Sequence, residues 1–148
     1  MKISDILRHK SAAGAGAVVT LRADQTVQQL LAALAEHNIG AVVVVDAEAP
    51  EKVAGIVSER DIVRHLAHAG AETLEQRVAD LMTTSVLSCT SSDSVDSIAE
   101  TMTAQRIRHL PVVDNGRLAG IISIGDVVSS RIRQLEHDRV QLEQYIAG

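Results

Sequence analysis

One short motif that contains a serine and an aspartate occurs twice in this chain of 148 residues: positions 55–61 read GIVSERD and positions 120–126 read GIISIGD. Each copy joins a β-branched apolar run to a helical pattern, which places the serine and aspartate at a helix N-terminus. A serine hydroxyl there can donate to a phosphate oxygen, and an aspartate can accept from both hydroxyls of a ribose. The helix N-terminus itself favours an anion. The two copies are candidates for two related nucleotide half-sites.

The same spacing also matches a capping box, in which a serine and an acidic residue three positions later satisfy the first amides of a helix. On that interpretation Ser58, Asp61, Ser123 and Asp126 stabilise their helices by about 1 kcal/mol each and bind nothing. Spacing alone leaves both interpretations open.

The two copies differ in charge. Arg60 stands inside the first copy and could neutralise a phosphate, whereas Gly125 fills that place in the second. A phosphate at the second copy needs a cation from elsewhere, and Arg106, Arg108 and His109 are the nearest candidates by pattern.

The repetition extends over most of the chain. Residue 18 aligns with 86, residue 39 with 107, and residues 44–46 (VVD) with 112–114 (VVD). Self-similarity of this kind indicates a duplicated structural unit. The lead-in segments 3–7 (ISDIL) and 78–82 (VADLM) also agree loosely.

Each half reads β-α-β-β-α, which predicts an α+β fold. Short strands are expected at 18–21 and 86–89, each followed by a polar cap region at Asp24 or Ser92 and an amphipathic helix. The apolar runs 41–45 and 110–113 predict further strands. The final helix of each half begins at the repeated motif.

Two signals refine the second half. Asn115-Gly116 is typical of a tight hairpin turn. Pro111 cannot donate a backbone hydrogen bond, so it indicates an edge position or the first residues of a strand.

The last helix continues past the second motif, and its apolar positions are spaced alternately by four and three residues, apart from one arginine: Val128, Ile132, Leu135, Arg139, Leu142 and Ile146. Such a seam fits a helix that folds back on its own domain and equally a helix that pairs between subunits. Both possibilities stay open.

Composition excludes several classes. The net charge of −5 argues against a nucleic-acid or anionic-membrane surface. The lone Cys89 excludes an internal disulfide and is expected to be an inert buried thiol.

The start of the chain has no apolar signal core, and the run 12–19 is too short to span a bilayer, so a cytoplasmic protein is expected. With almost no aromatic residues, a planar ligand would lie between aliphatic, histidine or arginine side chains.

No catalytic signature stands out in the chain. His65 and His68 lie three residues apart on a predicted helix, but a third metal ligand is not evident, so no metal site is expected. A Ser-His-Asp spacing, a phosphate-cradling glycine loop and paired carboxylates are all missing. We therefore expect a protein that is not an enzyme and requires no cofactor.

The duplicated β-α-β-β-α pattern, the two motifs, the LPVVD strand at 110–114 and the lead-ins together resemble a tandem cystathionine β-synthase (CBS) domain pair, also called a Bateman module. The resemblance runs from Lys2 to about Arg131 and leaves no room for an attached enzyme, which suggests a stand-alone CBS-domain protein. It implies two repeats related by pseudo-twofold symmetry, with two clefts that often hold AMP, ADP, ATP, NAD(H) or S-adenosylmethionine. The corresponding boundaries are 1–73 and 74–131 for the repeats and 132–148 for a C-terminal helical extension.

The resemblance also assigns the family's ligand-binding positions. They fall on backbone positions for the base, on the start of the first strand of each repeat, and on the motifs for ribose and phosphate: Ile39, Gly40, Ala41, Ile107, Arg108 and His109; Thr20 and Ser88; Ser58, Arg60, Asp61, Ser123 and Asp126.

The expected function is a regulatory module that senses an adenine nucleotide (AMP, ATP or NAD) and signals to a protein partner in trans, as a homodimer. The alternative is a ligand-independent dimerisation scaffold.

Overall fold

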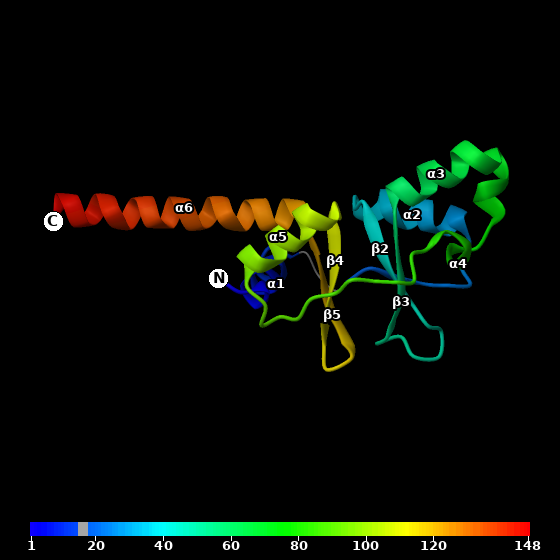
Figure 1. The fold of residues 1–148 in the computed structure, drawn as a ribbon, viewed down its shortest axis with the longest axis horizontal. Coiled ribbons are helices and arrows are strands. Elements are labelled where there is room, and N and C mark those ends of the chain that lie inside the picture. The colour runs from blue at the N-terminus through cyan, green and yellow to red at the C-terminus, as the bar shows by residue number, and fades with distance from the viewer. Residues whose placement is uncertain (15–17) are drawn as a thin grey trace.

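The computed structural model describes residues 1–14 and 18–148 and shows two small sheets side by side, each accompanied by helices (Figure 1). Within the described part, no helix combines the length and apolar character needed to cross a membrane. The apolar run 12–19 lies partly outside the described residues.

The first repeat has the predicted β-α-β-β-α order. Its elements are β1 (Thr20–Arg22), α2 (Val27–His37), β2 (Ala41–Val45), β3 (Val53–Ser58) and α3 (Glu59–Ala69), followed by the short 3-10 helix η1 (Gly70–Glu75). β2 lies at the centre of the sheet, parallel to β1 and antiparallel to β3. All five residues of β2 are buried, which explains its unbroken apolar sequence.

The second repeat consists of α5 (Val95–Gln105), β4 (His109–Asp114), β5 (Arg117–Ser123) and α6 (Ile124–Ala147), and is preceded by α4 (Val78–Leu81). The predicted hairpin turn is confirmed, because Asn115 and Gly116 take φ angles of 53° and 76° between the antiparallel strands β4 and β5. These positive angles suit the twist of a two-residue hairpin.

The strand predicted at 86–89 is wrong. Only Cys89 remains of it, as an isolated parallel bridge to Val112. The Cys89 N–H donates to the Pro111 carbonyl at 3.0 Å, and the Val113 N–H donates to the Cys89 carbonyl at 2.8 Å. The next bond toward residue 87 would need an N–H from Pro111, which proline lacks, so the ladder stops. In the first repeat the equivalent residue is Val43, which has an amide N–H, and β1 forms a regular strand there.

The first helix of each repeat begins two residues later than the predicted cap regions at Asp24 and Ser92. The Thr26 hydroxyl accepts from the Gln29 N–H at 3.2 Å, and the Ser94 hydroxyl accepts from the Ser97 N–H at 3.1 Å. Thr26 and Ser94 immediately precede the first buried apolar residue of each helix, so they are the N-caps.

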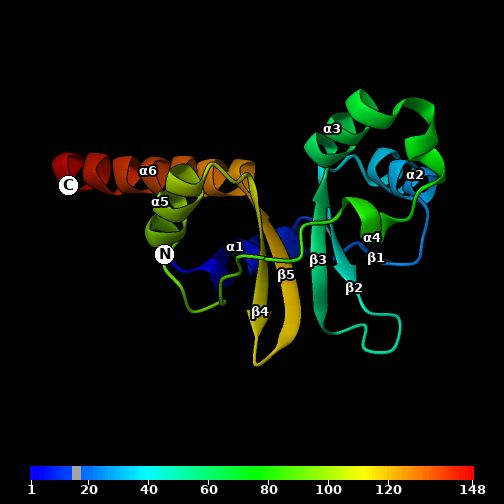
Figure 2. The same cartoon turned by 45° about the vertical axis from the view of Figure 1, so that its right-hand side comes forward.

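The two repeats exchange their lead-in helices. Ile3 and Ile6 of α1 (Ile3–Ala12) belong to the core of the second repeat, whereas Val78 and Leu81 of α4 belong to the core of the first. Figures 1 and 2 both show α1 beside β5 and α4 beside β3. The boundary at 73/74 stays a prediction for the sequence repeat, and each lead-in packs in the core of the other repeat.

The glycine that opens each motif permits this exchange. An added Cβ on Gly55 would lie 2.8 Å from the Thr83 carbonyl oxygen and from the Met82 sulfur. An added Cβ on Gly120 would lie 2.6 Å from Leu7 Cδ2. Both glycines therefore mark the close approach of a lead-in to the sheet.

The C-terminal helix does not fold back on its own domain. α6 is continuous from Ile124 to Ala147; its first turns pack on the second repeat, and the rest extends away from both repeats (Figure 1). Leu142 and Ile146 are 60% and 77% exposed, so the outer part of the predicted seam is not buried against the described part of this chain. Of the two sequence interpretations, the fold-back is wrong.

We predict that Gly55→Ala destabilises the protein by about 1–3 kcal/mol, because the new methyl group meets backbone that must shift. Gly120→Ala should cost less, since the end of the Leu7 side chain can rotate away. Gly125→Ala is the control: its nearest atom would be Ser123 Oγ at 3.5 Å, and alanine favours the helix. Urea unfolding followed by circular dichroism measures all three. Equal stability of the Gly55 and Gly125 variants would contradict the packing.

Candidate functional site

The two motifs form true capping boxes. The Ser58 N–H donates to Asp61 Oδ2 at 2.9 Å, and the Asp61 N–H donates back to Ser58 Oγ at 3.4 Å. In the second copy the Ser123 N–H donates to Asp126 Oδ2 at 2.9 Å, and the Asp126 N–H donates to Ser123 Oγ at 3.1 Å. These contacts fix the strand-to-helix turn at the start of α3 and of α6.

Capping uses only one oxygen of each aspartate. In the part of the chain that the structure describes, every side-chain hydrogen bond of Asp61 and Asp126 involves Oδ2. Oδ1 of both carboxylates therefore remains available to accept a hydrogen bond. The capping role and a ligand-binding role are compatible in the same residue.

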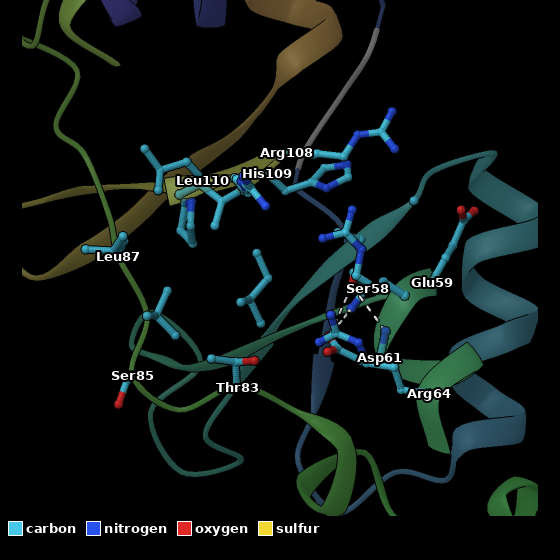
Figure 3. Close-up of a pocket in the computed structure, with 18 residues that line it drawn as sticks. Ser58, Glu59, Asp61, Arg64, Thr83, Ser85, Leu87, Arg108, His109 and Leu110 are labelled. Carbon is cyan, nitrogen blue, oxygen red and sulfur yellow. Dashed lines mark hydrogen bonds between the residues drawn. The ribbon is translucent and has the colours of Figure 1, made fainter. Parts of the chain in front are cut away.

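Ser58 and Asp61 face a cavity of about 270 Å³, here named cleft 1. The first repeat also contributes Arg60 and Arg64 to it, and the second contributes Ile107, Arg108 and His109. Figure 3 shows Ser58, Asp61 and Arg64 across the cavity from Arg108 and His109, with Thr83, Ser85 and Leu87 along a third side.

Ser123 and Asp126 face a second cavity of about 680 Å³, here named cleft 2. The first repeat contributes the predicted backbone positions Ile39, Gly40 and Ala41 to its wall. The motif of each repeat thus faces the backbone segment of the other repeat, as pseudo-twofold symmetry requires.

Both clefts have aliphatic walls at equivalent positions. Ile56, Val86, Leu87 and Ile107 line cleft 1, and Ile121, Val18, Val19 and Ile39 line cleft 2. A planar ring system can lie between such side chains without an aromatic partner.

Three of the predicted positions line both cavities: Gly40, Ala41 and His109. The first residues of α3 and α6 fix the backbone at residues 40 and 108. The Glu59 N–H donates to the Gly40 carbonyl at 3.0 Å, and the Ile124 N–H donates to the Arg108 carbonyl at 2.8 Å. The two junctions and the two clefts therefore form one connected site.

Thr20 and Ser88 are not among the described residues that line either cavity. The residues just before them take those places, Val18 and Val19 in cleft 2 and Val86 and Leu87 in cleft 1. A role for Thr20 and Ser88 in binding stays a prediction.

The cation of cleft 2 is Lys10, which the sequence reasoning missed. Its Nζ donates to Asp126 Oδ2 and to the Ile121 carbonyl oxygen, each at 3.0 Å. Of the three sequence-based candidates for this place, Arg106 and Arg108 line cleft 1, whereas His109 lines both clefts. Arg108 also lines a third cavity beside Ser123 and Gly125. Lys10 reaches Asp126 only because α1 packs on the other repeat, so no local pattern could reveal it.

Arg64 is a further residue of cleft 1 that was not predicted. It lies one helical turn after Arg60 on α3, so both arginines are on one face of the helix. The four-residue spacing of the two arginines was the available signal.

Burial lowers the pKa of His109, and the neighbouring Arg108 lowers it further, whereas Asp126 and Glu59 act in the opposite direction. The imidazole between the clefts is therefore neutral near pH 7.

Burial raises the pKa of the Cys89 thiol to about 11, which supports the expected inert thiol.

No group of three or more potential metal ligands occurs within residues 1–14 and 18–148. His65 Nδ1 lies 2.9 Å from the Asp61 backbone oxygen, so this ring contacts its own helix.

We predict that acid destabilises the protein partly through His109. A histidine whose folded pKa lies below the unfolded value of 6.5 contributes stability that is present above that value and is lost as the pH falls through the folded pKa. The melting temperature of the His109→Gln variant should therefore fall less than that of the wild-type protein when the pH is lowered from about 8 to about 5. Differential scanning fluorimetry across this range tests it; parallel curves would contradict the prediction.

Comparison with known proteins places this geometry in a family. The model of the CBS domain matches residues 3–68 and again residues 78–133. The CBS domain-containing protein CBSX3, mitochondrial, of Arabidopsis thaliana is 32% identical over 148 residues, covering 99% of this chain and 72% of the relative.

Solved structures agree with this match. The CBS-domain containing protein ATU1752 from Agrobacterium tumefaciens has a TM-score of 0.81 and 45% identity, over 88% of this chain and 99% of that one. The CBS domain protein PAE2072 from Pyrobaculum aerophilum, complexed with AMP, has a TM-score of 0.74 and 28% identity, over 85% and 89%. The CBS domain pair of protein MJ0100, in complex with 5′-methylthioadenosine and S-adenosylmethionine, has a TM-score of 0.75 and 26% identity, over 92% and 98%. With both repeats matched and the pseudo-twofold clefts in place, the chain belongs to the CBS-domain family as a CBS-domain pair.

Proposed function

We propose that this protein is a regulatory module that binds adenosine-containing ligands in clefts 1 and 2. The main support is the pair of strand-to-helix turns, each with an aspartate that lines a cavity shared by both repeats and whose Oδ1 accepts no hydrogen bond from the described residues. The candidates are AMP, ADP, ATP, NAD(H) and S-adenosylmethionine. Structures of PAE2072 with AMP and of the MJ0100 pair with S-adenosylmethionine support this ligand class.

Each part of an adenosine ligand has a partner in this arrangement. Asp61 or Asp126 accepts from the ribose hydroxyls through Oδ1. The adenine lies between the aliphatic walls, beside the backbone of residues 107–109 in cleft 1 and of residues 39–41 in cleft 2. In cleft 1 a 5′ phosphate meets Ser58, Arg60 and the amides at the start of α3.

The site supports regulation in preference to catalysis. Both clefts are lined by the two repeats, so a bound ligand contacts both and favours the arrangement of repeats that it fits best. A protein partner that recognises this arrangement would receive the signal in trans. We assign no enzymatic step to the chain.

We predict that Asp61→Asn weakens the binding of an adenosine ligand in cleft 1 and Asp126→Asn weakens it in cleft 2, each by at least about tenfold, because a charged acceptor for the ribose is lost. The double variant should show no measurable binding. Isothermal titration calorimetry with AMP, ATP, NAD(H) and S-adenosylmethionine measures this.

Asp80→Asn is the matched control. Asp80 caps α4 with the same geometry, its Oδ2 accepting from the Arg77 N–H at 3.1 Å, but it lines neither cleft. Its variant should bind as wild type does. Absence of binding by the wild-type protein, or full binding by the Asp61/Asp126 double variant, would disprove the proposed function.

A second candidate function is self-association, favoured by the exposed apolar residues of α6. Val128, Ile132, Leu135, Leu142 and Ile146 are each at least half exposed and follow the spacing of four and three residues. A second copy of the helix would cover this stripe and form a homodimer. In this role the protein is a dimerisation scaffold that needs no ligand.

We predict that Leu135→Glu with Leu142→Glu converts a dimer to monomers, because two charges enter the apolar seam. The control is His137→Glu with Gln144→Glu, which adds the same groups to the opposite face of α6 and should leave the dimer intact. Light scattering coupled to size exclusion reports the mass. The same mass for both double variants would argue against this helix as the interface.

A further inference from the structure

The two clefts differ sharply in charge. Four arginines and two carboxylates line cleft 1: Arg60, Arg64, Arg106, Arg108, Glu59 and Asp61. In cleft 2, apart from two histidines, the charged residues among the described lining are Lys10 and Asp126, and these two form an ion pair at 3.0 Å. Cleft 1 has an excess of positive charge, and cleft 2 is balanced.

We propose that the clefts select ligands by charge: cleft 1 takes an adenosine ligand that carries a 5′ phosphate, and cleft 2 takes one whose 5′ substituent has no phosphate. The inference rests on the proposed adenosine-binding function and adds to it which class of ligand each cleft accepts.

The arginines of cleft 1 are free to bind an anion. Within residues 1–14 and 18–148, none of Arg60, Arg64, Arg106 and Arg108 is within salt-bridge distance of a carboxylate. They approach from two directions, a pair on α3 and a pair around the start of β4. Guanidinium groups on both sides of a cavity suit a phosphate, which accepts several charge-assisted hydrogen bonds.

Arg106 stands in an unusual backbone conformation. It ends α5 with φ of 55°, a left-handed angle that arginine rarely adopts. The equivalent residue of the first repeat, which ends α2, is Asn38 at φ of 51°, and asparagine tolerates this region better. The chain therefore keeps an arginine at cleft 1 where local stability favours asparagine.

Among the described residues that line cleft 2, the one lysine is already engaged, and arginine is absent. Lys10 Nζ bonds both Asp126 Oδ2 and the Ile121 carbonyl oxygen, and Gly125 supplies no side chain where the first copy has Arg60. Arg108 lines the third cavity, beside Ser123 and Gly125 and together with Glu59, but it is not among the described residues that line cleft 2. A doubly charged phosphate inside cleft 2 would lose its hydration without an unpaired lysine or arginine in the described lining to replace it, which costs free energy. A neutral 5′ group among Val18, Val19 and Ile121 incurs no such cost.

The test compares AMP with 5′-methylthioadenosine, which differ only in the 5′ substituent. In calorimetry on the full chain, AMP should bind wild type and Asp126→Asn but not Asp61→Asn. The thioether should bind wild type and Asp61→Asn but not Asp126→Asn. A saturating concentration of one ligand should leave the stoichiometry of the other unchanged.

A double variant isolates the arginines. Arg64→Gln with Arg106→Asn should weaken AMP binding by at least about tenfold and leave the thioether affinity unchanged. The asparagine restores the residue type of the equivalent helix end, so the melting temperature should not fall, and it is measured alongside.

The outcomes separate the two levels of the proposal. Competition between AMP and the thioether, loss of AMP binding on Asp126→Asn, or an unaltered AMP affinity in the arginine variant would overturn the charge selection while adenosine binding itself stands. Binding of neither compound, nor of any other adenine ligand, would overturn the proposed function itself.

Discussion

The architecture depends on a carboxylate that holds the turn from strand to helix in each repeat. Asp61 and Asp126 accept the N–H of the serine three residues earlier and thereby fix where α3 and α6 begin. Backbone donors from the same helix starts then hold Gly40 and Arg108, which line the clefts. Since only Oδ2 of each aspartate takes part in the described hydrogen bonds, the interaction that shapes the site leaves Oδ1 available as an acceptor.

The two lead-in segments carry different residues, and this makes the two clefts unequal. α1 contributes Lys10 to cleft 2, whereas the equivalent position after α4 is Ser85, which lines cleft 1. The motifs show the reverse difference: the first, at cleft 1, contains the cation Arg60, whereas the second, at cleft 2, has Gly125 in that place. The motif itself thus supplies a cation to cleft 1, whereas the lead-in helix α1 supplies one to cleft 2. Of Arg60 and Lys10, only the lysine is paired with the motif aspartate.

Much of the site could be predicted from local patterns, because capping and hairpin signals act over a few residues. Ser58, Asp61, Ser123 and Asp126 lie where the motif placed them, and Asn115-Gly116 forms its turn. The predicted strand at 86–89 failed because its hydrogen bonds depend on the partner residue Pro111. The predicted fold-back of α6 was wrong because an apolar seam on a helix does not determine which surface covers it.

The sequence by itself determined the duplication, the order of elements and the pairing of hydroxyl with carboxylate at two helix starts, since these depend on periodicity and on contacts between near neighbours. Only the tertiary structure decided which charges share a cavity. Arg106 and Arg108 join the motif of the other repeat, and Lys10 meets Asp126 from across the chain. Such contacts follow from how the lead-ins cross between cores, where packing at Gly55 and Gly120 sets the approach.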